Sequence, residues 1–196
     1  MRLPPVLSRL FPSLQAPRFR LLQRMPKNAV CAEIGVWKGD FSREILRRTG
    51  PRMLHLIDPW VFQPEFPHRW FGGKRAGSQE EMDRIFERVR NRFGDRVDVS
   101  IHREYSAAAL AGFADGYFDW IYLDGNHAFE HILQDLDLGL AKVRPGGFLT
   151  GDDYGWGRKC GFPVEKAVHW FVEEHGLEDR LEIIESQFII EVPDDS

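Results

Sequence analysis

The stretch from Phe118 to Tyr154 constrains the fold most, because it reads as two strands that each end in acidic residues, joined by one helix. The apolar run 120–123 ends at Asp124. Apolar residues at 129, 132, 133, 136, 140 and 143 then recur at the spacing of one helical face. Arg-Pro-Gly-Gly at 144–147 predicts the end of that helix, and a second strand, 148–150, leads to Asp152 and Asp153. Parallel strands end at the same edge of a sheet, so the three carboxylates are expected in one crevice.

The same alternation of strands and helices runs through the rest of the chain. Regular elements are predicted as strands at 28–33, 53–57, 97–101, 181–185 and 188–192, and as helices at 41–48, 78–89, 105–113 and 164–174. The last two strands are separated by two residues, which indicates a hairpin. We therefore expect an α/β fold of three layers with a mostly parallel sheet that ends in an antiparallel hairpin.

Length, composition and charge limit the possible functions. The chain has 196 residues, 43% of them hydrophobic, and a formal net charge of −4, which argues against nucleic acid as a partner. No apolar run approaches the roughly 20 residues that a membrane-spanning helix needs. Two cysteines, Cys31 and Cys160, are too few for a disulfide framework, so a cytoplasmic location is expected.

The first 27 residues differ from the rest, which forms one predicted domain from 28 to 196. Residues 1–27 are basic, are interrupted by prolines, and lack the continuous apolar core and cleavage site of a signal peptide. We expect an arm with a short helix that packs either on the domain or on a second subunit, which would give a homo-oligomer. Attachment to a membrane surface is the alternative.

The end of the first strand carries a glycine-containing corner, Glu33-x-Gly35-x-x-x-Gly39. Glycine at such a corner allows a ligand to approach the backbone closely, although many glycine corners are only tight turns. Asp58 ends the next strand 23 residues beyond Gly35, near the roughly 20 at which a carboxylate meets ribose hydroxyls in dinucleotide folds. The spacing is not the GxGxxG of NAD sites, and no phosphate-binding GxxxxGK[ST] run is present. A ligand with a ribose and no pyrophosphate, such as S-adenosylmethionine, fits better.

Several segments together resemble one family. These are AEIGVWKGDFS at 32–42, LIDPW at 56–60, SQEEMDRIFERV at 78–89, the stretch 118–154 and the final hairpin. Across about residues 28–192 the chain resembles the class I S-adenosylmethionine-dependent methyltransferases, and among them the small bacterial sugar and macrolide O-methyltransferases. The resemblance implies their Rossmann-like fold with a seven-stranded sheet, and S-adenosylmethionine as the cofactor.

The resemblance also implies roles for individual residues. Glu33, Gly35 and Gly39 would line the methionine end of the cofactor, Asp58 would hold the ribose hydroxyls, and Glu104, Tyr105 and Ser106 would flank the adenine and ribose. Asp124, Asp152 and Asp153 match the acids that hold a divalent ion, usually Mg²⁺, in metal-dependent relatives. In the alternative interpretation, Asp124 and Asp153 contact the cofactor or cap helices.

The catalytic base departs from the family pattern. Some sugar-modifying relatives carry a further carboxylate two places after the first metal acid, where this chain has Asn126, which cannot accept a proton. His127 is the available base, and Asp124 would act beside it through the metal. Otherwise His127 would form hydrogen bonds at the helix start or contact the metal carboxylates. Many relatives also have His in place of Asp152.

The predicted function is methyl transfer from S-adenosylmethionine to a hydroxyl of a small molecule, a sugar or glycosylated metabolite, with Mg²⁺ assistance. One alternative is a domain that binds the cofactor without transfer activity, or serves as a partner subunit. A protein or RNA methyltransferase is disfavoured by the acidic charge and by Asp-Gly-Asn-His at 124–127, where such enzymes carry an Asn-Pro-Pro-Tyr-like corner.

Overall fold

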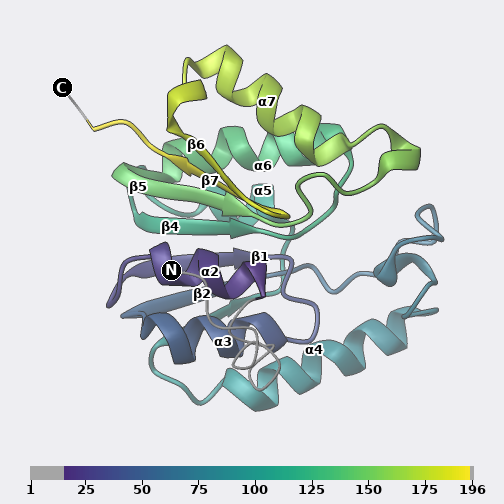
Figure 1. Cartoon of the computed structure of the whole chain (residues 1–196). Helices are drawn as coiled ribbons and strands as arrows, with labels where there is room; N and C mark the ends of the chain where they lie inside the picture. Colours follow the sequence, from purple (N-terminus) through teal and green to yellow (C-terminus); the bar gives the residue numbers. More distant parts are fainter. Residues whose placement is uncertain (1–15, 195–196) are drawn as a thin grey trace, which may run out of the picture.

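A computed structural model describes residues 16–194, which are organised around a seven-stranded sheet (Figure 1). The strand order is β3-β2-β1-β4-β5-β7-β6, and only β7 runs antiparallel to its neighbours. The strands are β1 (Val30–Ile34), β2 (Met53–Ile57), β3 (Val99–His102), β4 (Phe118–Leu123), β5 (Val143–Gly151), β6 (Leu181–Ile184) and β7 (Gln187–Glu191). The prediction of a mostly parallel sheet with a terminal hairpin is confirmed.

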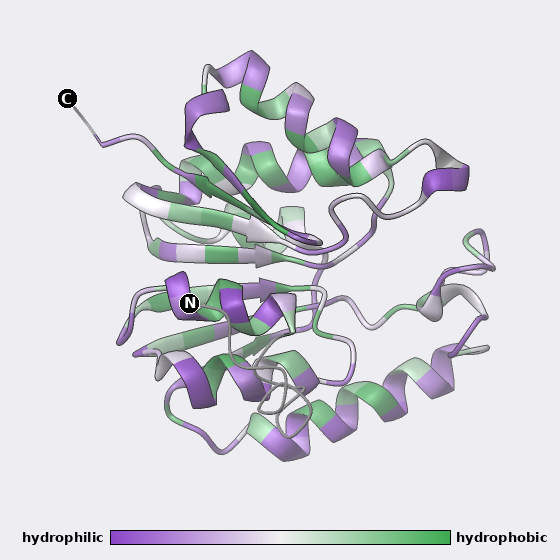
Figure 2. Cartoon of the chain, viewed as in Figure 1, coloured by the Kyte–Doolittle hydropathy of each residue, from purple (hydrophilic) through white to green (hydrophobic). Residues whose placement is uncertain are grey.

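Helices cover both faces of the sheet and give the predicted three layers (Figure 1). One face packs against α2 (Pro17–Arg24), α3 (Asp40–Thr49) and α4 (Gln79–Phe93), and the other against α5 (Ser106–Ala111), α6 (Phe129–Lys142) and α7 (Pro163–His175). Short 3₁₀ turns occupy Trp70–Gly72, Arg158–Cys160 and Glu178–Arg180. Hydrophilic and hydrophobic residues alternate around α4 and α7, as expected for helices with one buried face (Figure 2).

The central strands are buried on both sides. All five residues of β1 are buried, with Ala32 facing the core of α5, α6 and α7 and Cys31 facing the core of α2, α3 and α4. Such strands carry continuous apolar runs rather than an alternating pattern. The predicted start of α4 is also confirmed, because the Ser78 hydroxyl accepts a hydrogen bond from the Glu81 backbone N–H at 3.3 Å.

One predicted boundary differs in the structure. The chain passes directly from α6 into β5, whereas 144–147 was predicted as a turn before a shorter strand. The register explains the difference, because Phe118 pairs with Val143 and Trp120 pairs with Phe148, so that residues 144–147 bulge opposite a single residue of β4. The predicted turn is therefore a bulge inside the strand.

The N-terminal helix α2 packs on its own domain. Leu21 and Leu22 are fully buried and Met25 is 3% exposed, in the same core as α3 and α4. The first interpretation of the arm therefore holds for α2, while residues 1–15 and any oligomer contact through them lie outside the described residues. Within 16–194, no helix has the length and apolar character required to cross a membrane.

Candidate active site

A cavity of about 600 Å³ lies at the carboxyl ends of β1, β2 and β4. The strand order reverses at this point, because β2 and β3 lie on one side of β1 while β4 and β5 lie on the other. Open α/β sheets bind their ligands at such switch points, and the volume is typical of small-molecule sites. Of the residues predicted from the sequence, the cavity is lined by Glu33, Gly35, Asp58, Tyr105, Ser106, Asp124, His127 and Asp153.

Gly35 is required by the contact between two strand ends. Its φ is +89°, and a Cβ at this position would lie 2.2 Å from the Asp124 carbonyl oxygen. Gly39 has a different role, because it caps α3 with φ +73°, and a Cβ there would lie 2.6 Å from the Phe93 ring. Gly39 is not among the residues that line the cavity. Of the two predicted glycines, only Gly35 therefore lines the cavity.

Asp58 connects the corners that follow β1 and β2. Its Oδ2 accepts a hydrogen bond from the Trp37 backbone N–H at 2.9 Å, and its Oδ1 accepts one from the Trp60 backbone N–H at 2.7 Å. Burial raises the pKa of Asp58, and these backbone hydrogen bonds oppose that rise. The carboxylate is thus held in a fixed orientation at the cavity wall.

Glu33 is a buried acid at the end of β1. Only 1% of the residue is exposed, and the Ser42 hydroxyl donates a hydrogen bond to Oε2 at 2.5 Å. Burial raises the pKa of Glu33 to about 8, although the Ser42 hydrogen bond acts in the opposite direction. The side chain is therefore mainly protonated at neutral pH, and a cationic ligand beside it would favour its ionised form.

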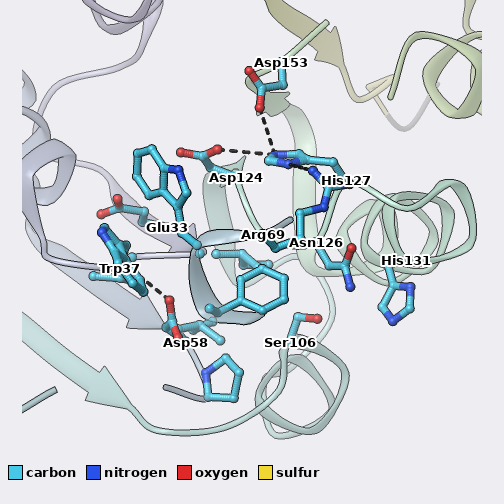
Figure 3. Close-up of a pocket in the computed structure, with 18 of the residues that line it drawn as sticks. Glu33, Trp37, Asp58, Arg69, Ser106, Asp124, Asn126, His127, His131 and Asp153 are labelled. Carbon is cyan, nitrogen blue, oxygen red and sulfur yellow. Dashed lines mark hydrogen bonds and ion pairs between the residues drawn. The ribbon is translucent and has the colours of Figure 1, made fainter. Parts of the chain in front are cut away.

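Asp124, His127 and Asp153 converge from the two acidic corners (Figure 3). The His127 Nε2 lies 3.5 Å from Asp124 Oδ1 and 3.3 Å from Asp153 Oδ2, and one ligand atom from each residue lies within 4.8 Å of the others. Nε2 is buried without a hydrogen-bond partner, while Nδ1 lies 3.3 Å from Arg69 Nη1. Two carboxylates and an unsatisfied ring nitrogen form a donor set that fits a divalent metal ion.

Asp152 lies outside this group, although the sequence predicts it as a third metal ligand. It is 7% exposed and does not line the cavity. Its Oδ2 accepts a hydrogen bond from Arg18 Nε at 2.6 Å, and its Oδ1 accepts one from the Gln187 side-chain amide. Both oxygens are engaged by protein donors, so His127 takes the place in the cluster that Asp152 was expected to fill.

Arg18 is the main site residue that sequence reasoning missed. Its Nη2 donates a hydrogen bond to Asp124 Oδ2 at 2.8 Å, and its guanidinium lies 5.1 Å from the Phe41 ring centroid. Burial would lower the pKa of Arg18, but Tyr122, Asp124 and Asp152 raise it above its ordinary value, so the side chain stays charged. In the sequence it is one of several arginines in the basic arm, and nothing there distinguishes it.

Of the residues predicted to flank the adenine and ribose, some line the cavity and others do not. Tyr105 and Ser106 line the cavity, whereas Glu104 does not. Asp135 of α6 was not predicted, yet it lines the same region, is 5% exposed, and has its pKa raised to about 6 by burial. Asn126 accepts a hydrogen bond from the Ala128 backbone N–H at 3.1 Å, so its role is to shape the turn that leads into α6.

The loop between β2 and α4, residues 58–78, lines one side of the cavity. Arg69 lies with its guanidinium 4.6 Å from the ring centroid of Trp156, which follows the second acidic corner. Trp70 and Trp156 both line the cavity and remain 49% and 41% exposed. The loop and the segment after β5 therefore meet beside the acid and histidine cluster, where both tryptophans remain partly exposed.

The fold is that of a Rossmann-like α/β protein with a cavity at its switch point, the place where such folds bind their ligands. A family profile described as "Methyltransferase domain" matches residues 32–154, which is more than half of the chain. The chain belongs to this methyltransferase family, and its cofactor is S-adenosylmethionine. A comparison with curated protein sequences gives no significant match.

Solved structures of methyltransferases share the fold. The O-methyltransferase NovP matches with a TM-score of 0.60 and 22% identity over 95% of this chain and 80% of its own. MycE of the mycinamycin biosynthetic pathway, in complex with Mg and SAH, matches with a TM-score of 0.56 and 15% identity over 98% of this chain and 49% of its own. An O-methyltransferase family protein from Burkholderia thailandensis matches with a TM-score of 0.56 and 14% identity, over 97% of this chain and 57% of its own. At these identities the likeness establishes the fold alone.

Proposed function

We propose that this methyltransferase acts on a hydroxyl of a small molecule, a sugar or glycosylated metabolite, with the help of a divalent metal ion. The supporting observation is that Asp124, His127 and Asp153 converge in the cavity that also contains Glu33 and Asp58. The residues proposed for the cofactor and those proposed for the metal thus border one space, as transfer from cofactor to acceptor would require.

At the cofactor end, the proposed roles follow from charge and position. S-adenosylmethionine supplies a methyl group on a sulfonium sulfur, which leaves as a neutral thioether. Asp58, held by two backbone amides, would accept hydrogen bonds from the ribose hydroxyls. Glu33 and the Gly35 corner would border the methionine part, where an ammonium group can balance the Glu33 carboxylate. Tyr105 and Ser106 would border the adenine.

At the acceptor end, Asp124, His127 and Asp153 would hold the metal ion. A bound divalent ion lowers the pKa of a coordinated hydroxyl and fixes its orientation. Carboxylates suit Mg²⁺, and the imidazole nitrogen also makes Mn²⁺ a good fit. The exposed faces of Trp70 and Trp156 would pack against the acceptor ring.

Chelation tests the metal proposal directly. Turnover of S-adenosylmethionine over a panel of sugars and glycosides should fall at least a hundredfold in EDTA and return with Mg²⁺ or Mn²⁺. The dissociation constant of the cofactor, measured by calorimetry, should change less than threefold. Full turnover after chelation would remove the metal from the proposal. Cofactor binding without turnover of any acceptor would favour the domain that binds without transferring.

The role of His127 requires a separate experiment, because its Nε2 faces the carboxylates and could act as a ligand or as the base. His127→Ala should lower kcat at least a hundredfold in either case. If His127 is a metal ligand, His127→Ala should also weaken Mn²⁺ binding at least tenfold, measured by electron paramagnetic resonance. If His127 is only the base, the substitution should leave the Mn²⁺ affinity unchanged. His175→Ala, which removes a surface histidine paired with Asp137, serves as the control. An unchanged kcat in His127→Ala would exclude both roles.

A further inference from the structure

We propose that Arg18 of the N-terminal helix is a positioning residue for methyl transfer, which holds Asp124 so that one carboxylate oxygen stays turned toward His127 and Asp153. The inference rests on the proposed function, since it assigns Asp124 a part in the reaction. It extends that function to a helix outside the matched methyltransferase segment, 32–154.

The contacts of Arg18 differ from those of a surface arginine. Its Nε and Nη2 donate to Asp152 Oδ2, and Nη2 also donates to Asp124 Oδ2, so that the guanidinium bridges the two acidic corners. The planar guanidinium lies near the adjacent rings of Phe41 and Tyr122, at 5.1 and 5.9 Å from their centroids. Planar guanidinium groups suit such bridges, because several donors point in fixed directions.

The two carboxylate oxygens of Asp124 have different partners. Oδ2 faces Arg18 at 2.8 Å, while Oδ1 lies 3.5 Å from His127 Nε2. Without Arg18 the carboxylate could rotate, and either oxygen could face the cavity. A fixed carboxylate reduces the reorganisation required when the acceptor binds, and even small misplacement of such groups lowers rates strongly.

Arg18 also explains why Asp152 is turned away from the cavity. Arg18 and the Gln187 side-chain amide occupy both of its oxygens, and the fixed positive charge balances the negative charge of the neighbouring acids. Asp152 is therefore the anchor for an internal cation. In this chain, Asp152 lies outside the cavity lining and anchors Arg18, which lines the cavity and supports Asp124.

The test compares two arginines of the same helix in the full chain. Arg18→Ala should lower kcat at least tenfold, while KM for S-adenosylmethionine changes less than threefold. Millimolar ethylguanidinium should restore part of the lost kcat, whereas ethylammonium should restore less, because it lacks the planar set of donors. Arg24→Ala removes the contact of the same helix with Glu182, at 2.5 Å, and should stay within twofold of the wild type. Arg18→Lys should lie between the wild type and Arg18→Ala.

Several outcomes would overturn the proposal. These are a kcat of Arg18→Ala within twofold of the wild type, an equal loss in Arg24→Ala, or a loss that ethylguanidinium does not reduce. If Arg18→Ala does not fold, the comparison of Arg18→Lys with the wild type decides. If the wild type transfers methyl to no acceptor, the proposed function fails separately. Crystal structures of both alanine variants then decide, because only Arg18→Ala should let the Asp124 carboxylate rotate.

Discussion

Burial of Glu33 makes the free energy of unfolding depend on pH. This residue ends β1 inside the core, with Ser42 as its hydrogen-bond donor, and its pKa is raised to about 8 by burial. The unfolded chain releases this proton near pH 4.5. Between these two values the folded protein therefore binds more protons than the unfolded chain, and Glu33 makes stability fall as pH rises.

Replacing Glu33 by Gln should remove this pH dependence. Without added cofactor, the free energy of unfolding at pH 9, measured by urea denaturation, should be higher for Glu33→Gln than for the wild type by on the order of 3–5 kcal/mol. This difference should shrink as the pH is lowered toward 4.5. Glu80→Gln, at a side chain 88% exposed on α4, should show no such trend. A constant difference between Glu33→Gln and the wild type from pH 5 to 9 would contradict the raised pKa.

At the residue scale, the sequence predicts positions better than contacts. Asp58 and Asp124 reach the cavity because each directly follows a parallel strand, and Asp153 reaches it from the second position after β5. Asp152 points away, because side chains at successive positions diverge and Arg18 is available to bind it. Whether one arginine of the basic arm reaches that aspartate depends on the docking of a helix 134 positions away, which no local pattern encodes.

At the scale of elements, helix α2 combines a packing role with a chemical role. Its apolar side places Leu21 and Leu22 in the core against α3 and the sheet, and its first turn carries Arg18 to the acidic corners. The sequence predicts a short helix here but leaves its partner open, because a Pro-interrupted basic segment suits several surroundings. Only the tertiary structure shows that this helix packs on the core of its own domain.

Leu22→Ala should therefore destabilise the whole domain. Removal of a fully buried leucine leaves a cavity, so the free energy of unfolding should fall by about 2–4 kcal/mol, measured by urea denaturation. Arg24→Ala, on the exposed side of the same helix, should change it by less than about 1 kcal/mol. A change below about 0.5 kcal/mol in Leu22→Ala would mean that α2 does not share the core of the domain.

At the scale of the whole molecule, the cavity joins elements from both halves of the sheet. Glu33 and Asp58 belong to β1 and β2 and their corners, while Ser106 begins α5 and Asp124 follows β4. The alternation of strands and helices predicts the three layers and the mostly parallel sheet, whereas the strand order comes from the structure. The bulge in β5 was not predicted, because it depends on pairing with the neighbouring strands.

Binding of the product cofactor should stabilise this arrangement. S-adenosylhomocysteine at a hundred times its dissociation constant should add about 2.7 kcal/mol to the free energy of unfolding. For a chain of this size, that corresponds to a rise in melting temperature of about 5–10 °C, measured by calorimetry. NAD at the same concentration should give no shift, because the corner at Gly35 lacks the pyrophosphate motif. Equal shifts with both compounds would contradict the cofactor assignment.

The hydrogen bonds of Asp152 also bear on the order in which the site forms during synthesis. Arg18 leaves the ribosome long before Asp152, but Gln187 of β7 leaves after it. Because β7 lies between β5 and β6, the sheet beside Asp152 is incomplete until that strand has emerged. A nascent chain would therefore carry the corners of β1 and β2 early, and would complete the surroundings of Asp152 only after β7 has been synthesised. Newly made protein would begin to consume cofactor only after the sheet has closed.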